Sequence, residues 1–250
     1  MKRFADKVAL ITGAGSGIGR AAAERLASEG CKVVCIDVND QGIQQTLETI
    51  KMQGGEAVGW RCDVTDMNDI EATINKTIAQ YGKLNVLCNI AGIIQFENTL
   101  DVKMEDFDRV MNVNLRGTFM MIQKALPHLI ESKGNIVNMS STAALGAHAW
   151  TAAYSASKGA IQALTSTIAI EFGRLGVRCN AVCPASIKTP LAGTFKLPTG
   201  ADKTLLQKIM PFDGIFREPA DVAGAVAFLA SDDAIHVNGD YIRTDGGMMS

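Results

Sequence analysis

The chain of 250 residues is 47% hydrophobic and 20% charged, with a formal net charge of -2. This apolar fraction can fill the core of one large α/β domain, and the charges lack the basic run that a nucleic-acid partner would require. No apolar run approaches the roughly 18 residues of a membrane span. The basic N-terminus leads into glycines instead of a cleavage site, so we expect a soluble, cytoplasmic protein without a signal peptide.

Six cysteines lie mostly in apolar, strand-like runs, at positions 31, 35, 62, 88, 179 and 183. No C-x-x-C pair occurs, and on a strand the two C-x-x-x-C pairs are spaced too widely to hold one metal ion. We therefore expect no metal site and interpret the cysteines as small buried side chains in a reducing compartment.

Short apolar runs alternate with helical patterns along most of the chain. In chain order, strands are predicted at 7–12, 32–37, 56–61, 85–90, 134–139, 177–182 and 241–243. Helices are predicted at about 17–30, between the second strand and 50, and at 66–81, 103–130, 152–174 and 219–230. Continuously apolar strands are typical of a parallel sheet covered on both faces. The pattern predicts one domain over residues 1–250, a doubly wound α/β sheet (Rossmann fold) with ligands at the carboxyl ends of its strands.

The segment 185–217 breaks this rhythm with several prolines and glycines. It predicts a mobile flap with a short helix over the substrate. The apolar side chains that the flap would offer are Leu191, Phe195, Leu197, Leu206, Ile209, Met210 and Phe212.

A glycine-rich turn at residues 12–19 joins the first predicted strand to a helix. Glycines let the backbone approach a pyrophosphate, whose charge the helix N-terminus stabilises. A plain strand-to-helix turn is the alternative, but the next strand ends at Asp37, where a carboxylate can accept hydrogen bonds from the adenosine ribose. The charge of Asp37 would repel the 2′-phosphate of NADP, and the turn carries no Lys or Arg, so the pattern favours NAD.

The spacing Gly13-x-x-x-Gly17-x-Gly19 resembles that of the short-chain dehydrogenase/reductase family, and the resemblance extends from near residue 6 to residue 247. Two positions depart from the family pattern: Ile90 replaces the second Asn of its Asn-Asn-Ala-Gly motif, and Ala185 replaces the glycine of its Pro-Gly motif. The resemblance implies that Asp63 contacts the adenine. The cofactor-binding residues that it implies are Thr12, Gly13, Ser16, Gly17, Ile18, Gly19, Asp37, Cys62, Asp63, Val64, Asn89, Ala91, Gly92, Tyr154, Lys158, Pro184, Ile187 and Thr189.

The chemistry is expected at Tyr154 and Lys158, which share a face of a predicted helix. A phenol with a pKa of about 10 is a weak base, and we expect the Lys158 ammonium and oxidised nicotinamide to lower the pKa of Tyr154 for general acid/base catalysis. Such a pair also occurs on helices without any catalytic role. The family resemblance implies that Ser141 holds the substrate oxygen, with Ser140 as the alternative. It implies further that Asn114 holds a water next to Lys158, although a solvent-facing or kink-capping Asn114 is the other possibility.

These features predict an NAD-dependent enzyme that interconverts a secondary alcohol and a ketone. The small, apolar stretch 142–153 favours an uncharged substrate, although His148, or Lys188, Lys196 or Lys203 from the flap, would allow a carboxylate. A 3-oxoacyl thioester reductase is the second candidate, although such enzymes usually take NADPH. A non-catalytic dinucleotide-binding sensor or scaffold is the third. The resemblance also implies a homotetramer packed through the helices at 103–130 and 152–174, with the C-terminal residues 244–250 at a subunit contact.

Overall fold

In the described residues (2–146, 148–208, 210, 211 and 213–249), the computed structural model contains seven strands in one sheet, in the order β3-β2-β1-β4-β5-β6-β7. All neighbouring strands pair in parallel. The strands are Val8–Thr12 (β1), Lys32–Asp37 (β2), Glu56–Arg61 (β3), Val86–Asn89 (β4), Asn135–Met139 (β5), Arg178–Pro184 (β6) and Tyr241–Thr244 (β7). Because the chain crosses over between β3 and β4, a crevice opens at the carboxyl ends of β1 and β4, where such sheets bind ligands.

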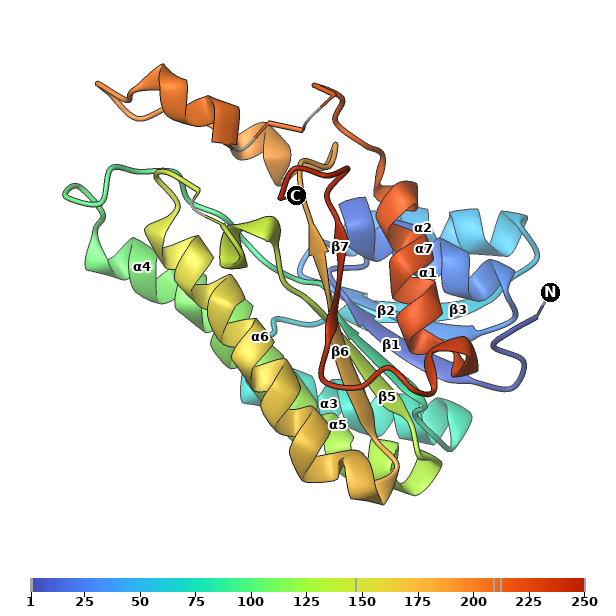
Figure 1. Cartoon of the computed structure of the whole chain (residues 1–250). Coiled ribbons are helices and arrows are strands. Elements are labelled where there is room, and N and C mark those ends of the chain that lie inside the picture. Colours follow the sequence, from blue (N-terminus) through green and yellow to red (C-terminus); the bar gives the residue numbers. More distant parts are fainter. Residues whose placement is uncertain (1, 147, 209, 212, 250) are drawn as a thin grey trace.

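Helices cover both faces of the sheet, which confirms the doubly wound prediction (Figure 1). Their bounds are Gly17–Ser28 (α1), Asp40–Met52 (α2), Met67–Tyr81 (α3), Met104–Met111 (α4), Gly117–Ser132 (α5), Ala152–Phe172 (α6) and Pro219–Ala230 (α7). α1, α2 and α7 bury apolar side chains on one face, and α3, α5 and α6 do so on the other. All six cysteines are buried with free thiols, as the sequence predicted.

Local sequence signals explain several helix ends. The side chains of Asn39 and Asp66 accept backbone amides at the starts of α2 and α3. Gly82 ends α3 in the left-handed conformation, with φ 73. α7 starts with Pro219 and a capping box. Each of these helices therefore begins or ends where its own sequence satisfies the free backbone groups.

The predicted helix at 103–130 is interrupted by a π-helical turn, Asn112–Arg116, between α4 and α5. A π turn widens the helix by one residue and often occurs at functional sites. It contains Asn114, whose carbonyl accepts a hydrogen bond from the Thr118 hydroxyl at 2.7 Å. The sequence pattern gave no sign of this turn, because one extra residue per turn barely alters the apolar periodicity.

The flap lies above the carboxyl ends of the strands, shown in orange in Figure 1. It contains two 3-10 helices, Ala192–Thr194 and Lys203–Lys208, where the sequence predicted one short helix. A parallel bridge between Ile187 and Arg217 joins its two ends. Ile209 and Phe212 lie outside the described residues. Within the described part of the chain, no helix combines the length and the apolar character needed to cross a bilayer.

Candidate active site

The glycine turn packs directly against the backbone that follows β4. A Cβ atom on Gly13 (φ +69) would lie 2.9 Å from the backbone of Ala91, and one on Gly19 would lie 2.1 Å from the carbonyl oxygen of Gly13. Thr12, at the end of β1, accepts the amides of Ile90 and Ala91 with its hydroxyl at 2.9 and 3.0 Å. Only glycine fits such close approaches, so these contacts fix the start of α1 at the crevice.

The N-terminus of α1 has the features of an anion site. Ser16, its N-cap residue, makes no side-chain capping bond within the described structure, and no acidic residue lies in the first turn. No acidic side chain in the first turn of α1 therefore offsets the positive end of the helix dipole or the backbone amides there. This arrangement fits the pyrophosphate of a dinucleotide.

Two carboxylates, Asp37 and Asp63, lie along the same cleft. Asp37 accepts the amides of Gly15 and Asn39, both at 3.0 Å. Asp63 accepts the amide and the hydroxyl of Thr65 at 2.8 and 2.7 Å, and these bonds hold the pKa of Asp63 below its ordinary value. Both side chains are thus oriented by nearby residues before any ligand binds.

A chain of amides braces the centre of the sheet. Asn89 donates to Asn138 at 2.9 Å, and Asn138 donates to the Thr165 hydroxyl on α6 at 2.9 Å. Ile90 packs against the apolar cluster beneath. The hydrogen bond that links β4 to β5 therefore comes from Asn89. The replacement of the family's second Asn by Ile90 does not remove this link.

Tyr154 and Lys158 project from α6 toward the end of β5. The Lys158 ammonium donates to the carbonyl of Met139 at 2.7 Å and lies 5.6 Å from the centre of the Tyr154 ring. The Ser141 side chain interacts with the Tyr154 phenol and by itself lowers the pKa of that phenol. Ser140 instead donates to the carbonyl of Lys158 at 2.9 Å, away from the phenol. This geometry favours Ser141 over Ser140 as the serine that meets a substrate.

Asn114 lies behind this group and is only 1% exposed, so the solvent-facing alternative is wrong. Its side chain accepts the amide of Ile93 at 2.8 Å and donates to the Ile93 carbonyl and to the Ser157 hydroxyl. A Cβ atom on Gly92 would lie 3.2 Å from the Asn114 oxygen and 3.4 Å from the Lys158 nitrogen. Glycine at position 92 therefore keeps space open between Asn114 and Lys158.

Burial dominates the electrostatics of the tyrosine and the lysine. It raises the pKa of Tyr154, against a smaller lowering effect from Ser141. It lowers the pKa of Lys158 to about 8. In the protein alone the pKa of Tyr154 is therefore raised and not lowered, because loss of hydration disfavours the phenolate more than Ser141 favours it. The predicted lowering in the presence of oxidised nicotinamide stays a prediction.

The segment after β6 reaches over the glycine turn. The amide of Ala185 donates to the Thr244 carbonyl at 3.3 Å and so continues the pairing of β6 with β7. A Cβ atom on Gly17 would lie 3.1 Å from the methyl group of Thr189. With Ala185 in place of the family's glycine, Thr189 still lies beside the glycine turn, where the sequence predicts the nicotinamide end of a dinucleotide.

One cleft of about 950 Å³ brings most of the predicted residues together. The predicted site residues that line it are Gly13, Ser16, Gly17, Ile18, Gly19, Asp37, Cys62, Asp63, Val64, Ala91, Gly92, Ser141, Tyr154, Lys158, Pro184, Ile187 and Thr189. Thr12, Asn89 and Asn114 are buried behind its wall.

The cleft also has walls that the sequence did not predict. One is a face of α4 and the π turn, formed by Arg109, Asn112, Val113 and Arg116. Their helical spacing is a signal that was available in the sequence. The other is the loop after Gly92, which contributes Phe96. No periodic pattern marks that loop, because its path depends on contacts with distant segments.

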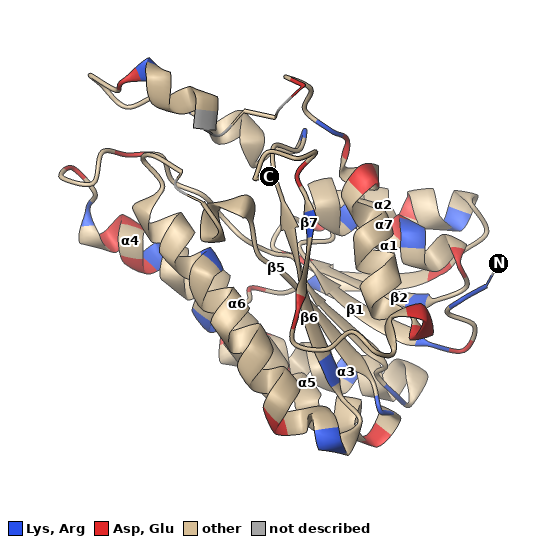
Figure 2. Cartoon of the chain, viewed as in Figure 1, with Lys and Arg blue, Asp and Glu red and all other residues tan. Residues whose placement is uncertain are grey.

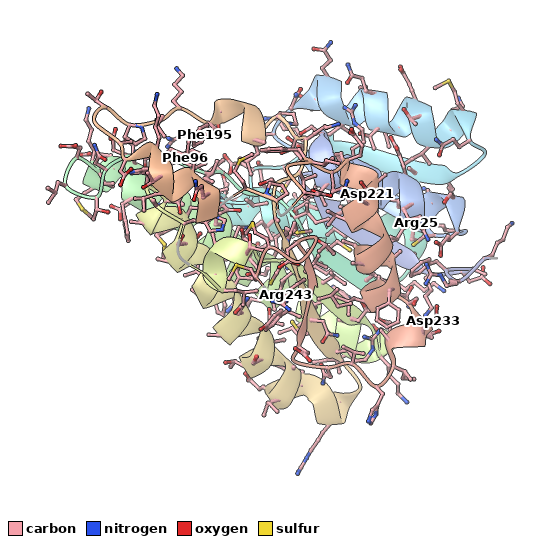
Figure 3. The ribbon with its side chains drawn as sticks, turned by 45° about the horizontal axis from the view of Figure 1, so that its top comes forward. Arg25, Phe96, Phe195, Asp221, Asp233 and Arg243 are labelled. Carbon is pink, nitrogen blue, oxygen red and sulfur yellow. The ribbon has the colours of Figure 1, made fainter. Side chains whose placement is uncertain are left out.

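The far end of the cleft is apolar. Phe96 and Phe195, on the flap, meet edge to face with their ring centres 4.7 Å apart (Figure 3). His148 also lines this end, 3.4 Å from the Thr142 hydroxyl, and burial lowers its pKa, so it is neutral near pH 7. Of the predicted flap contacts, Leu191, Phe195, Leu206 and Met210 are among the described lining residues. Leu197, Lys188, Lys196 and Lys203 are not, and Lys188 pairs with Glu218 at 2.6 Å.

Comparison with known proteins agrees with this geometry. A family model described as enoyl-(acyl carrier protein) reductase matches residues 13–249. The chain belongs to the short-chain dehydrogenase/reductase family. It is 37% identical to meso-2,3-butanediol dehydrogenase of Serratia marcescens, over 98% of this chain and 95% of that protein. It is 38% identical to a 3-oxoacyl-acyl-carrier-protein reductase of Thermotoga maritima, over 99% of both chains.

The fold of this short-chain dehydrogenase/reductase matches solved structures equally well. The crystal structure of levodione reductase superposes with a TM-score of 0.91 at 33% identity, over 98% of each chain. Enzymes of this family are oxidoreductases that use a nicotinamide dinucleotide. The names of the two relatives point to different substrates, a diol and an oxoacyl thioester, so membership of the family does not choose between them.

Proposed function

We propose that this chain is an NAD(H)-dependent oxidoreductase that interconverts a secondary alcohol and an uncharged ketone, with Tyr154 as general acid/base. The observation that carries the proposal is the buried Tyr154 side chain in the wall of the cleft, which Ser141 also lines, with the Lys158 ammonium 5.6 Å from the centre of the Tyr154 ring. A phenol and a hydroxyl that meet in this way present two donors to one carbonyl oxygen.

Bound NAD(H) supplies or accepts the hydride. For ketone reduction, Ser141 and Tyr154 bind the carbonyl oxygen, and Tyr154 donates its proton to that oxygen. The phenol must be protonated to act as an acid, and burial, which raises the pKa of Tyr154, favours the protonated form. For alcohol oxidation, Tyr154 takes the proton, and the nearby Lys158 ammonium stabilises the phenolate. Asn114 positions the backbone at Ile93 beside this group, and its implied role in holding a water near Lys158 stays a prediction.

The preference for NAD rests on Asp37. Its carboxylate lines the cleft, where it would bind the ribose hydroxyls and repel a 2′-phosphate. Arg20, which follows the glycine turn, bonds instead to the carbonyl oxygens of Gly15 and Gly42 and to the side chains of Gln45 and Thr46. Its guanidinium thus bonds to these groups and not to Asp37.

An uncharged, moderately hydrophobic substrate fits the far end of the cleft. Phe96, Phe195 and Leu206 form apolar walls there, and His148 is neutral. The flap covers this end as one unit, joined at its base by Ile187 and Arg217. The second candidate, a 3-oxoacyl thioester reductase, is favoured by the full-length match to the Thermotoga maritima enzyme. A sensor without catalysis is disfavoured, because binding alone would not require Asn114, Ser141, Tyr154 and Lys158 together.

The enzyme also assembles as a homotetramer through α5 and α6 in this proposal. Phe119 on α5 is 44% exposed and Ile170 on α6 is 85% exposed. Between Lys158 and Glu171, α6 carries no charged residue (Figure 2). Exposed apolar residues on neighbouring long helices are typical of subunit contacts. Light scattering of the purified protein and of Ile170→Glu tests this assembly, and the variant is expected to have a lower mass.

The central test is a fluorescence titration with NADH and with NADPH. Oxidation of the bound cofactor is then followed with a panel of ketones, oxoacyl thioesters and keto acids. Tight NADH binding with turnover of uncharged ketones supports the proposal. NADPH preference with thioester turnover would favour the second candidate, and NADH binding without any turnover would favour the sensor.

A further inference from the structure

The last residues of the chain fold back into a closed turn. After β7, the buried carboxylate of Asp245 accepts the amides of Gly247 and Met249, both at 3.1 Å. Arg243, labelled in Figure 3, donates to the Met249 carbonyl at 2.9 Å. Figure 1 shows that this end of the chain lies near the flap, at the carboxyl ends of the strands. The segment 245–249 is therefore held in place at both of its ends.

The side chain of Met249 rests on Gly146. A Cβ atom on Gly146 would lie 2.3 Å from the Met249 methyl carbon and 2.9 Å from its sulfur, and the next atom, the Thr142 carbonyl oxygen, is 4.0 Å away. The thioether thus fills the space where a side chain at position 146 would stand. Methionine suits this place, because its flexible, polarisable side chain adapts to an irregular surface.

Gly146 ends a compact turn that starts at Ser141. The amides of Leu145 and Gly146 donate to the Thr142 carbonyl at 3.0 and 2.9 Å, and the amide of Ala143 donates to the Ser141 hydroxyl at 3.1 Å. Ser141 and Thr142 line the cleft, and the Ser141 side chain interacts with the Tyr154 phenol. Met249 therefore contacts the end of a short, hydrogen-bonded unit whose other end bears the serine of the site.

We propose that Met249 is a positioning residue that braces the turn 141–146 and so holds Ser141 and the neighbouring wall in the arrangement that receives the substrate. In this proposal the C-terminal segment 245–249 supports the substrate end of the cleft in the same chain. It does not affect the cofactor end. The bracing is a property of the fold, whereas its effect on catalysis rests on the proposed function.

Two single substitutions remove this contact from opposite sides. Met249→Ala deletes the thioether. Gly146→Ala keeps Met249 but displaces it, because φ at Gly146 is not positive and the Met249 side chain supplies the close contacts. Gly224→Ala on α7 is the matched control, since the atom nearest to its new methyl group would be Nη1 of Arg25, at 3.9 Å.

The first readout is amide hydrogen exchange, which needs no turnover. We expect the amides of Leu145 and Gly146 to exchange roughly tenfold faster in both variants, and at the wild-type rate in Gly224→Ala. Unchanged exchange in Met249→Ala and Gly146→Ala would overturn the brace. Hydrogen exchange can be measured even if the wild-type enzyme turns over no ketone. Lack of turnover would contradict the proposed function, but it would not contradict the role of Met249 in bracing the turn 141–146.

The second readout is the split between KM and kcat with the best ketone of the panel. We expect each variant to raise the ketone KM by about fivefold, with kcat and the NADH Kd changed less than about twofold. The double variant should be no worse than either single variant, because both remove the same contact. Additive losses, or faster exchange with an unchanged KM, would overturn the positioning role.

Discussion

The two ends of the cleft are built in different ways. At the cofactor end, Gly13, Asp37 and Asp63 are held by backbone contacts and by residues close to them in the sequence or on the neighbouring strand. At the substrate end, single side-chain contacts join segments that are distant in the sequence, such as Phe96 to Phe195 and Gly146 to Met249. The first end is therefore easily predicted from motifs. The second depends on contacts between distant segments, which no local motif marks.

Tyr154 lies where the two ends meet, and its removal has the largest expected effect. Tyr154→Phe should lower kcat for ketone reduction by about 10³-fold, because the only proton donor to the carbonyl oxygen in the proposed mechanism is lost. The NADH Kd, measured by fluorescence titration, should stay close to the wild-type value. Appreciable turnover by this variant would remove Tyr154 from the mechanism.

Asp37 tests the cofactor end alone. Asp37→Asn keeps an oxygen that can accept the Gly15 amide but removes the charge. The ratio of NADPH to NADH affinity should therefore rise by about tenfold, with the ketone KM unchanged. Asp37→Ala, which also loses the hydrogen bond, should weaken binding of both cofactors. A constant ratio in both variants would place the carboxylate away from the ribose.

Phe195 tests the substrate end alone. Phe195→Ala removes the edge-to-face contact with Phe96, so KM for bulky apolar ketones should rise by about fivefold while NADH affinity is unchanged. Leu197→Ala, on the same flap but outside the cleft lining, is the matched control. If both variants alter KM equally, the aromatic pair does not shape the substrate end.

The buried lysine gives the smallest effect, on stability. The pKa of Lys158 falls from 10.5 in the unfolded chain to about 8 in the folded protein, so below pH 8 folding must bury a charged ammonium. This penalty is complete at neutral pH and disappears as pH rises from about 8 to 10.5. Lys158→Met should therefore raise Tm by a few degrees at pH 7, with a smaller gain at pH 10. An equal shift at both pH values would show that packing, and not charge, decides the difference.

The sequence by itself determined the strands and helices, the glycine turn, the position of Asp37 and the shared face of Tyr154 and Lys158. These features depend on periodicity and on spacing within one or two elements. The tertiary structure alone decided the raised pKa of Tyr154, the hydrogen bond from Ser140 to the Lys158 carbonyl, the π turn at Asn114 and the contact of Met249 with Gly146. Each of these depends on burial or on contact between distant segments. A local sequence pattern does not indicate which residues become buried or which distant residues come into contact.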